Sequence, residues 1–413
     1  MNIEQAAAID QHIKPRQRRS VASWMLIALT VAGSVSPVYG ATGETIRPEF
    51  GLLIVTFLFL MGVSQAGVVF CAICRLTGAQ WSKPYYRLAE LSTMAFSPFA
   101  ILGFLLIYYY AREDLFYWLS ASPDEHLSPW LNSNWFLLRQ LFGLLLFYGL
   151  STVYVVKAIQ PDLSGSNHVD HREVERQLYL LSPLVLIAFV ICNTFFAWDF
   201  AMMIIPHWHS TVFPIHYWFG NLYAGTAALL AIPVILGRFS TTKSRFGARQ
   251  IRMLSMMITA FMLLWLYFFW AQFFVMWFGN LPHETGPLWR QMYGHYAPYY
   301  WAMMAGCFFV PFITLIFAFI NRSLPAMCII GLGINMGVWI NKYLMVIPVF
   351  SPDDRPLDNL LDTGLSIGLL AAFLAVLVLL ARRLPVYSNW EINLRPDTAG
   401  SLDGDPDRTS IHP

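Results

Sequence analysis

The stretch from Ala197 to Gly220 concentrates side chains that can exchange protons or bind ligands. It reads AWDFAMMIIPHWHSTVFPIHYWFG and holds Asp199, His207, His209 and His216 between two long apolar runs. An ionisable group at membrane depth costs about a few kcal/mol or more, and such groups usually line a cavity, a proton path or a partner-facing site. This stretch, named the hinge below, is therefore the first place to expect chemistry.

A metal or haem site is one interpretation of the hinge histidines. On a helix, His209 and His216 would share a face, whereas His207 and His209 would not. Haem b needs axial ligands, normally histidines, at depth on two facing helices, but the remaining histidines lie in predicted loops or tails. Because imidazole titrates near neutral pH, proton handling at the interface or ordinary loop hydrogen bonding fits the hinge better. We expect this chain to bind no metal and no redox cofactor.

The composition identifies the elements that must position these residues. The 413 residues are 57% hydrophobic and only 12% charged, whereas a soluble domain is about 25% charged. Apolar segments reach the roughly 20 residues that a helix needs to cross a bilayer, and alternating barrel strands are absent. The sequence therefore predicts an all-α integral membrane protein.

Ten segments are predicted to span the membrane, at about 21–40, 50–74, 89–111, 135–157, 178–199, 213–237, 253–278, 297–320, 324–348 and 363–381. The first is the weakest, because a basic lead before an apolar run is also typical of a signal peptide. We expect one ten-helix membrane domain over residues 21–384, forming two four-helix bundles plus flanking helices. Residues 1–20 and 385–413 are expected to be solvated tails.

The basic residues predict the orientation, because loops on the cytoplasmic side carry an excess of Lys and Arg. Twenty of the 26 Lys and Arg residues fall on one side of the ten-span arrangement. Both termini are then cytoplasmic, the hinge is periplasmic, and the protein is a multi-pass protein of a bacterial inner membrane. The net charge of +2, spread over several loops, indicates no nucleic-acid partner.

The cysteines do not form a recognisable metal motif. Cys71 and Cys74 make a C-x-x-C inside an apolar run, with Arg75 after it rather than a haem-attachment histidine, and no second pair follows. We interpret both cysteines as small residues at helix contacts, and expect neither an iron–sulfur cluster nor a zinc site.

Other polar side chains fall inside the predicted spans and should face the interior of the bundle. They are Gln65, Glu90, Thr93, Asn193, Asn221, Gln272, Asn335, Asn341 and Lys342. Contacts between helices would explain the amides. Snorkelling to the interface would explain Asp199, Glu90 and Lys342, which lie towards span ends. The alternative is a proton path through Asp199, His207, His209, Glu90 and Lys342.

Charges of both signs gather on the predicted periplasmic side. Arg112 follows the third span, Arg139 lies one turn inside the fourth, and Glu284 and Arg290 lie in the 279–296 loop. Tryptophans accompany them, although tryptophan favours membrane interfaces in any case. We interpret this face as a docking surface for a periplasmic subunit, with quinone contact at Arg112, Tyr109, Arg139, Glu284 and His216 as the second interpretation.

Four segments together resemble a known family. They are GVSQAGVVFCAICRLTGAQWSKPYYRLAELST (62–93), WDFAMMIIPHWHSTVF (198–213), WFGNLPHET (277–285) and NKYLMVIP (341–348). They are similar to the NrfD/PsrC superfamily of polysulfide-reductase-like membrane subunits, most closely the smaller such subunit of alternative complex III. In the hinge, Trp198 and Asp199 stand in the reverse of the family's order.

The resemblance implies a cofactor-free membrane subunit that works beside quinol oxidation. Its implied partners are membrane lipid, a sister subunit of the same family, and periplasmic iron–sulfur and c-type haem subunits. Quinol-binding members carry a His-Leu-Gly-Arg segment after the third span, where this chain has Tyr109, Tyr110, Ala111 and Arg112. The fourth-span acid of those members is also missing, with Asn134 and Arg139 there instead. The sister subunit is therefore the expected site of quinol binding.

Three functions follow from these observations. The first is a subunit of a quinol–cytochrome c oxidoreductase that anchors periplasmic redox partners and conducts protons by a carboxylate–imidazole–water relay. The second is a quinone-binding anchor of a molybdopterin or polysulfide-reductase-type enzyme. The third, a secondary transporter, is disfavoured because its substrate site would lie at the midplane, away from the polar hinge.

Overall fold

The computed structural model describes residues 50–112, 116–119, 128–164, 170–205, 208–239, 246–280, 282–317, 319–350 and 360–393. Within these ranges the regular elements are helices, and no strand occurs. The predicted first span at 21–40, the tail of residues 1–20, residues 394–413 and His207 lie outside the described residues.

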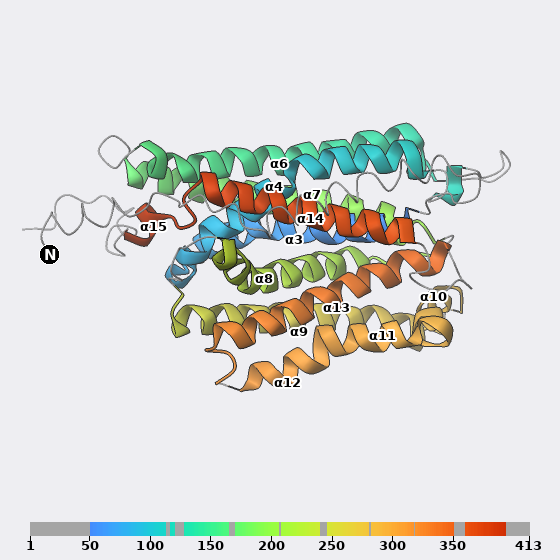
Figure 1. Ribbon diagram of the computed structural model, residues 1–413. Coiled ribbons are helices and arrows are strands. Elements are labelled where there is room, and N and C mark those ends of the chain that lie inside the picture. Colours follow the sequence, from blue (N-terminus) through green and yellow to red (C-terminus); the bar gives the residue numbers. More distant parts are fainter. Residues whose placement is uncertain are drawn as a thin grey trace, which may run out of the picture.

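The long helices follow the apolar runs of the sequence. They are α3 (Gly51–Leu76), α4 (Lys83–Leu106), α6 (Ser133–Ser164), α7 (His171–Ala197), α8 (Phe213–Phe239), α9 (Ala248–Phe278), α13 (Leu324–Phe350) and α14 (Leu360–Arg383). Shorter helices are α10 (Pro282–Met292), α11 (Ala297–Met304), α12 (Val310–Ile316) and α15 (Asn389–Asn393). Figure 1 shows the long helices running side by side, with α10 and α15 at opposite ends of the molecule.

Nine helical segments of the described part are long and apolar enough to cross a membrane. They coincide with the second to tenth spans that the sequence predicts, from Gly51–Leu76 to Asp362–Arg383. The α11–α12 pair forms one of these spans, because a π-helical turn at Ala305–Phe309 joins the two helices. The all-α, multi-pass membrane class is thus confirmed.

Helix α3 is the centre of the structure. It packs against α4, α7, α8, α13 and α14, and nearly all of its side chains are buried. Its glycines allow the close approach: a Cβ on Gly67 would lie 2.2 Å from the Ala89 carbonyl oxygen of α4. Small residues at such positions are the usual means by which helices pack in membranes, where lipid offers no hydrophobic driving force between them.

Two π-helical turns extend helices at the end of the molecule that carries α10. One follows α4 at Ile107–Ala111, and the other follows α7 at Trp198–Met202, within the hinge. π-Turns frequently occur at functional sites because they re-aim side chains within an otherwise regular helix. The hinge therefore consists of a π-turn, a non-helical connection and the first turns of α8. We call this end of the molecule the hinge end, and the other the α15 end.

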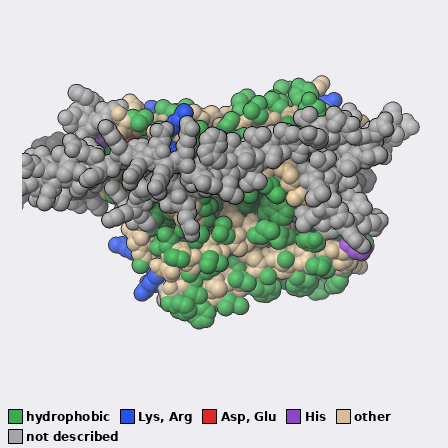
Figure 2. Space-filling model, in the orientation of Figure 1, with side chains coloured by type: hydrophobic (Ala, Val, Ile, Leu, Met, Phe, Trp, Pro, Cys, Tyr) green, Lys and Arg blue, Asp and Glu red, His purple; other side chains and the backbone are tan. Residues whose placement is uncertain are grey.

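The surface fits a lipid environment. Figure 2 shows one face covered largely by hydrophobic side chains where it is coloured, with Lys or Arg side chains at the margin on the α15 side and a histidine at the margin of the hinge end. Exposed large side chains include Trp270, Phe274, Val275 and Phe278 of α9. These residues are available to contact lipid.

The chain folds back after the last span. The sequence predicts a solvated tail from residue 385, but α15 packs against α4 and α6. Trp390 donates from its indole Nε1 to the Ala158 carbonyl oxygen at 3.0 Å, and its ring stacks on His171 at 5.6 Å between centroids. Residues 387 to 391 thus include buried side chains that belong to the membrane domain.

Candidate functional site

Asp199, the acid of the hinge, lies in a closed hydrogen-bonded clamp. Arg139 of α6 donates to both of its carboxylate oxygens, Nε to Oδ2 and Nη2 to Oδ1, each at 2.7 Å. Trp130 donates to Oδ1 at 3.0 Å, and the Gln140 amide donates to Oδ2. Asp199 is only 2% exposed. Such bidentate pairs are the strong, directional kind, so this hinge clamp fixes α6 to the end of α7.

Arg139 is held on all sides as well. Its Nη1 donates to the Trp130 carbonyl oxygen at 2.8 Å, and its guanidinium carbon lies 4.4 Å from the centroid of the Trp130 ring. A cation over the face of an indole is attracted by the ring quadrupole. From the sequence we expected Asp199 on a proton path and Arg139 at a quinone or partner contact, whereas the structure brings the two side chains into one site.

The hinge histidines do not converge. His209 precedes α8 and is exposed, and its backbone N–H donates to Glu284 Oε2 at 3.2 Å. His216 lies inside α8 and is buried. Because α8 begins at Phe213, close to the start of the predicted span at 213–237, His209 is not on that helix and shares no helix face with His216. Within the described ranges, no group of three or more His, Cys, Asp or Glu residues could hold a metal ion.

The hinge is tied to α10 through Glu284. In addition to the contact with His209, the Trp208 indole donates to the Glu284 carbonyl oxygen at 3.0 Å. The expected partner-facing residue Glu284 thus holds the hinge connection against α10.

The side chains of Arg112 and Tyr109, two of the expected quinone-contact residues, lie in different environments. The Arg112 guanidinium carbon lies 4.9 Å from the Tyr108 ring centroid, and its Nη1 is 3.5 Å from Ser133 Oγ. Tyr109 is 65% exposed. The structure therefore does not assemble Arg112, Tyr109 and Arg139 into one pocket among the described residues.

A chain of buried amides crosses three central helices. Asn221 of α8 donates to Asn193 of α7 at 2.6 Å, and Asn193 donates to Gln65 of α3, also at 2.6 Å. The Gln65 amide in turn donates to Cys192 Sγ at 3.4 Å. These three amides, named the amide ladder, are almost completely buried. Because buried polar groups need partners, each amide depends on its neighbours for satisfaction.

Lys342 of α13 is a buried ionisable side chain in the second half of the chain. Its side chain is 1% exposed, and Nζ lies 2.9 Å from the centroid of the Tyr217 ring. No described carboxylate lies within 4.0 Å of it in an ion pair. Lys342 is thus enclosed by the bundle rather than extended to the interface. Tyr217 lies one helical turn before Asn221 of the amide ladder, so both share a face of α8.

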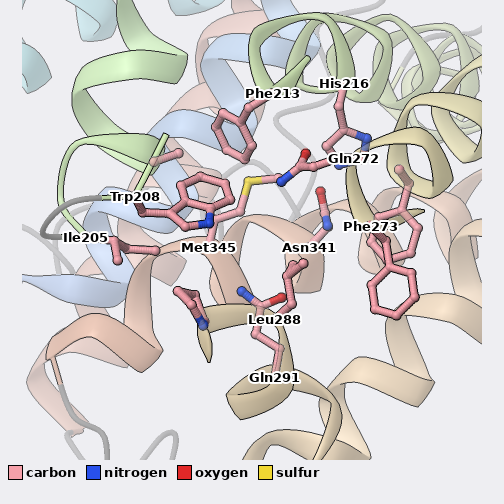
Figure 3. A pocket seen from close by; sticks show the side chains of 13 residues that line it. Ile205, Trp208, Phe213, His216, Gln272, Phe273, Leu288, Gln291, Asn341 and Met345 are labelled. Carbon is pink, nitrogen blue, oxygen red and sulfur yellow. The ribbon is translucent and has the colours of Figure 1, made fainter. Parts of the chain in front are cut away.

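A cavity lies beside Lys342, at the hinge end. His216, Gln272, Gln291 and Asn341 supply its polar atoms, from α8, α9, α10 and α13. The remaining lining residues are Ala201, Ile205, Trp208, Phe213, Phe269, Phe273, Pro287, Leu288 and Met345. Figure 3 shows the side chains converging on it from these helices, with His216 next to Gln272. Its empty volume, open mouth included, is about 530 Å³. We call it the hinge cavity.

The polar lining of the hinge cavity is only partly satisfied within the protein. Gln291 donates to the Leu344 carbonyl oxygen at 2.7 Å. His216 Nδ1 is buried without a hydrogen-bond partner among the described residues, and so is the hydroxyl of the adjacent Tyr217, which does not itself line the cavity. Water bound in a polar cavity typically makes about three hydrogen bonds to such groups. The cavity thus has the chemistry to hydrate the surroundings of Lys342.

Glu90 lies at the opposite end of the molecule from the hinge. It is fully buried and pairs with Arg87, one helical turn earlier, at 2.7 Å. Arg87 and its other partner, Asp162, were missed by the sequence analysis, although the spacing of three residues between Arg87 and Glu90 is a recognisable helix pair. The sequence gives no such local signal for Asp162, which comes from another helix.

Together these features define a class: a multi-pass, all-helical membrane protein whose buried polar groups lie at both ends and across the centre of the bundle. The family model described as Polysulphide reductase, NrfD matches residues 41–351, about three quarters of the chain. The chain therefore belongs to the NrfD family, whose members are membrane subunits of polysulfide-reductase-type complexes and typically partner redox subunits. No curated protein matches the sequence.

Proposed function

We propose that this chain is a membrane subunit of a quinol:cytochrome c, or quinol:acceptor, oxidoreductase of the alternative complex III type. In this role it binds no cofactor itself and anchors periplasmic iron–sulfur and c-type haem subunits beside a sister subunit of the same family. Quinol is oxidised at the sister subunit. Both termini are cytoplasmic, in a bacterial inner membrane.

The helix arrangement in this proposal is two four-helix bundles. The first comprises α3, α4, α6 and α7, and the second comprises α8, α9, the α11–α12 span and α13, with α14 as a flanking helix. Partner subunits dock on the hinge end, where the Trp208–Glu284 contact fixes the hinge to α10. Arg112 follows the π-turn after α4, and Glu284 and Arg290 lie in α10 at that end, which supports this position for a protein partner.

Proton conduction is the second part of the proposed function. The observation that carries it is Lys342, a lysine enclosed in the bundle without a carboxylate partner among the described residues. Ionisable residues in membrane spans by default mark ion or proton paths. The hinge cavity brings water towards Lys342 and His216, and the amide ladder continues from Asn221 to Gln65 across the bundle centre. Bridging waters complete the path to Glu90.

This geometry favours Lys342 over Asp199 as the proton carrier. Four donating groups surround Asp199: two nitrogens of Arg139, the Trp130 indole and the Gln140 amide. Protonation of Asp199 would weaken the hydrogen bonds that its carboxylate accepts and would leave Arg139 without its counter-charge. In our proposal Asp199 positions helices, His209 lies at the outer entrance, and Lys342 and Glu90 carry the proton; His207, the other expected path residue, lies outside the described residues.

The composition of the intact complex tests the proposed assembly. Affinity purification of the tagged chain from its own membranes, in mild detergent, is expected to recover a second NrfD-family subunit together with iron–sulfur and haem c subunits. Haem c is read from the absorption spectrum and quinol oxidation from cytochrome c reduction. Recovery of the chain alone, without redox subunits, would contradict the proposal.

The second function, a quinone-binding anchor of a molybdopterin enzyme, remains as the alternative. The Tyr108–Arg112 contact beside Ser133 favours it, since it leaves a cationic group at the end of α4 where a quinone oxygen could bind. The same purification separates the two, because the alternative predicts molybdenum in the complex. A chain that purifies alone and takes up a substrate in vesicles would instead indicate the secondary transporter.

A further inference from the structure

Two arginines at the α15 end each hold two carboxylates. Arg75 of α3 pairs with Glu175 of α7 and, at 2.6 Å, with Glu391 of α15. Arg87 of α4 pairs with Glu90 and Asp162, both at 2.7 Å. We call these six residues the arginine cluster. It joins α3, α4, α6, α7 and α15 at one end of the bundle.

The cluster is buried except for Glu175, whose side chain is 33% exposed, and its arginines have few donors left for further groups. Arg75 gives Nε to the Tyr154 hydroxyl at 2.9 Å, and Arg87 gives Nη2 also to the Ala158 carbonyl oxygen at 3.0 Å. Glu90 is 0% exposed and Glu391 is 1% exposed. Glu90 Oε1 and Glu391 Oε2 have no hydrogen-bond partner among the described residues. The two deepest carboxylates each therefore keep one oxygen without a donor.

The formal charges of the cluster do not balance. Arg75 and Arg87 face four carboxylates. Lys83 is a further cation at this end: with Arg75, Glu175 and Glu391 it lines a small cavity. Three cations then oppose four carboxylates. A buried carboxylate without a counter-charge costs several kcal/mol, and taking up a proton is the usual way in which such a group avoids this cost.

We propose that the arginine cluster is a proton-binding site, in which one proton is shared between Glu90 and Glu391. Bound there, the proton converts a carboxylate into a carboxylic acid and brings the cluster to neutrality. The chain segment after the last span completes the site, because α15 supplies Glu391 across 316 residues of sequence from Arg75. The small cavity lined by Arg75, Lys83 and Glu391 is the route to the water at this end.

Other titratable groups face the cluster from every helix around it. They are Cys71 and Cys74 of α3, Tyr86 and Lys83 of α4, Tyr154 of α6 and His171 of α7. Cys71 already donates to the Tyr86 carbonyl oxygen at 3.6 Å, and Tyr154 already accepts from Arg75. Glu90 and Glu391 remain as the fully buried acids with a free oxygen.

The proton-binding site extends the proposed proton path. Its role during quinol oxidation rests on that proposed path, but the binding of the proton does not. The binding itself is tested without the redox complex. Infrared spectroscopy of the full-length chain in lipid nanodiscs at pH 7 measures the C=O stretch of protonated carboxyl groups, identified by its shift in D₂O. Exposed Asp and Glu, with pKa values of about 4, are ionised at that pH and contribute no such band.

The wild-type chain is expected to show this band, and Glu90→Gln and Glu391→Gln are each expected to remove most of it. Glu175→Gln should also weaken the band, since it removes the excess negative charge that retains the proton. The matched control is Glu173→Gln, two residues away on α7, because Glu173 is exposed and its contacts are with Arg176 at 3.7 Å and the Gln177 amide at 2.9 Å. That variant should keep the wild-type band.

Two results would overturn the proton site: no carboxylic acid band in the wild type, or a band that persists in both Glu90→Gln and Glu391→Gln. Persistence would assign the band to another buried acid such as Asp362. Where Glu90→Gln does not fold, Glu391→Gln decides, because Glu391 belongs to the short peripheral helix α15. If the assembled complex moved no protons, the carboxylic acid band of the wild-type chain would still be present. The proton site and the proposed proton path can therefore be contradicted independently of each other.

Discussion

Arg139 and Asp199 stand 60 residues apart in the sequence and meet through two hydrogen bonds of 2.7 Å at the hinge end of the bundle. This contact joins two spans, α6 and α7, at the point where α7 ends in a π-turn. The Arg139–Asp199 contact therefore fixes the start of the hinge, which leads into α8 and contributes to the lining of the hinge cavity.

Removing one partner of the clamp should destabilise the protein strongly. Asp199→Asn leaves Arg139 as a buried cation without its counter-charge, a change that typically costs about 3–5 kcal/mol. Thermal unfolding in detergent should show a clear drop in Tm. The exposed pair Glu173–Arg176 provides the control, since its loss should cost about 0–1 kcal/mol.

A double substitution separates the clamp role from a proton-carrying role. Arg139→Met with Asp199→Leu removes both charges, and should recover much of the stability lost in Asp199→Asn. If Asp199 only positions helices, proton movement by the assembled complex should recover with stability. Full stability with no proton movement would instead make Asp199 part of the path.

Lys342→Met should block proton movement while keeping the fold. The substitution retains an unbranched apolar side chain of similar length beside Tyr217, and it removes a buried amine that lacks a carboxylate partner among the described residues. Tm should stay at or above the wild-type value, because burying a polar group without a hydrogen-bonding counterpart carries a desolvation cost. Proton translocation is measured with a pH-sensitive dye in vesicles that contain the assembled complex.

The control for Lys342→Met is Lys157→Gln. Lys157 lies near the opposite end of the bundle and donates to Gln177 at 2.6 Å. The control should retain both stability and proton movement. Unchanged proton stoichiometry in Lys342→Met would remove this lysine from the path.

The amide ladder should be more sensitive than an isolated amide in the same bundle. Asn193→Leu removes the central member and leaves the Asn221 N–H group and the Gln65 carbonyl oxygen without their ladder partners, at about 1–3 kcal/mol for each buried polar group. Asn335→Leu is the comparison, because Asn335 donates only to the Gly331 carbonyl oxygen one turn earlier in α13, at 2.8 Å. Equal losses of Tm in the two variants would contradict the coupling of the ladder.

The contact between α3 and α4 should depend on Gly67. In Gly67→Ala the new Cβ would lie 2.2 Å from the Ala89 carbonyl oxygen and 2.7 Å from Ser92 Oγ and Thr93 Oγ1, so the helices must separate. Such overpacking typically costs about 1–3 kcal/mol. Gly149→Ala, where no atom lies within 4 Å of the added Cβ, should leave Tm unchanged or slightly raised. Both values come from the same thermal unfolding measurement.

The apolar runs were enough to predict the spans. The second to tenth predicted spans coincide with helices because about 20 consecutive apolar residues in lipid have few alternatives to a helix, whose backbone groups bond within the segment. The polar residues inside the spans were also correctly expected to face the interior, as Gln65, Glu90, Asn193, Asn221 and Lys342 do. Burial of each followed from the cost of placing it in lipid.

The partners of those residues did not follow from the sequence. Arg139 and Asp199 were assigned to separate roles, and Arg75, Asp162 and Glu391 were not singled out at all. A pair such as Arg75 and Glu391 is 316 residues apart, so no local spacing reveals it.

The sequence by itself determined the class of protein, because hydrophobicity and length act locally on each segment and fix where a helix must cross the membrane. Only the tertiary structure decided which buried charges neutralise one another. Ion pairing and hydrogen bonding depend on distances of about 3 Å between side chains from different helices, and the packing around α3 sets those distances. That packing closes Asp199 in a clamp, leaves Lys342 beside a cavity, and gathers four carboxylates around two arginines at the α15 end.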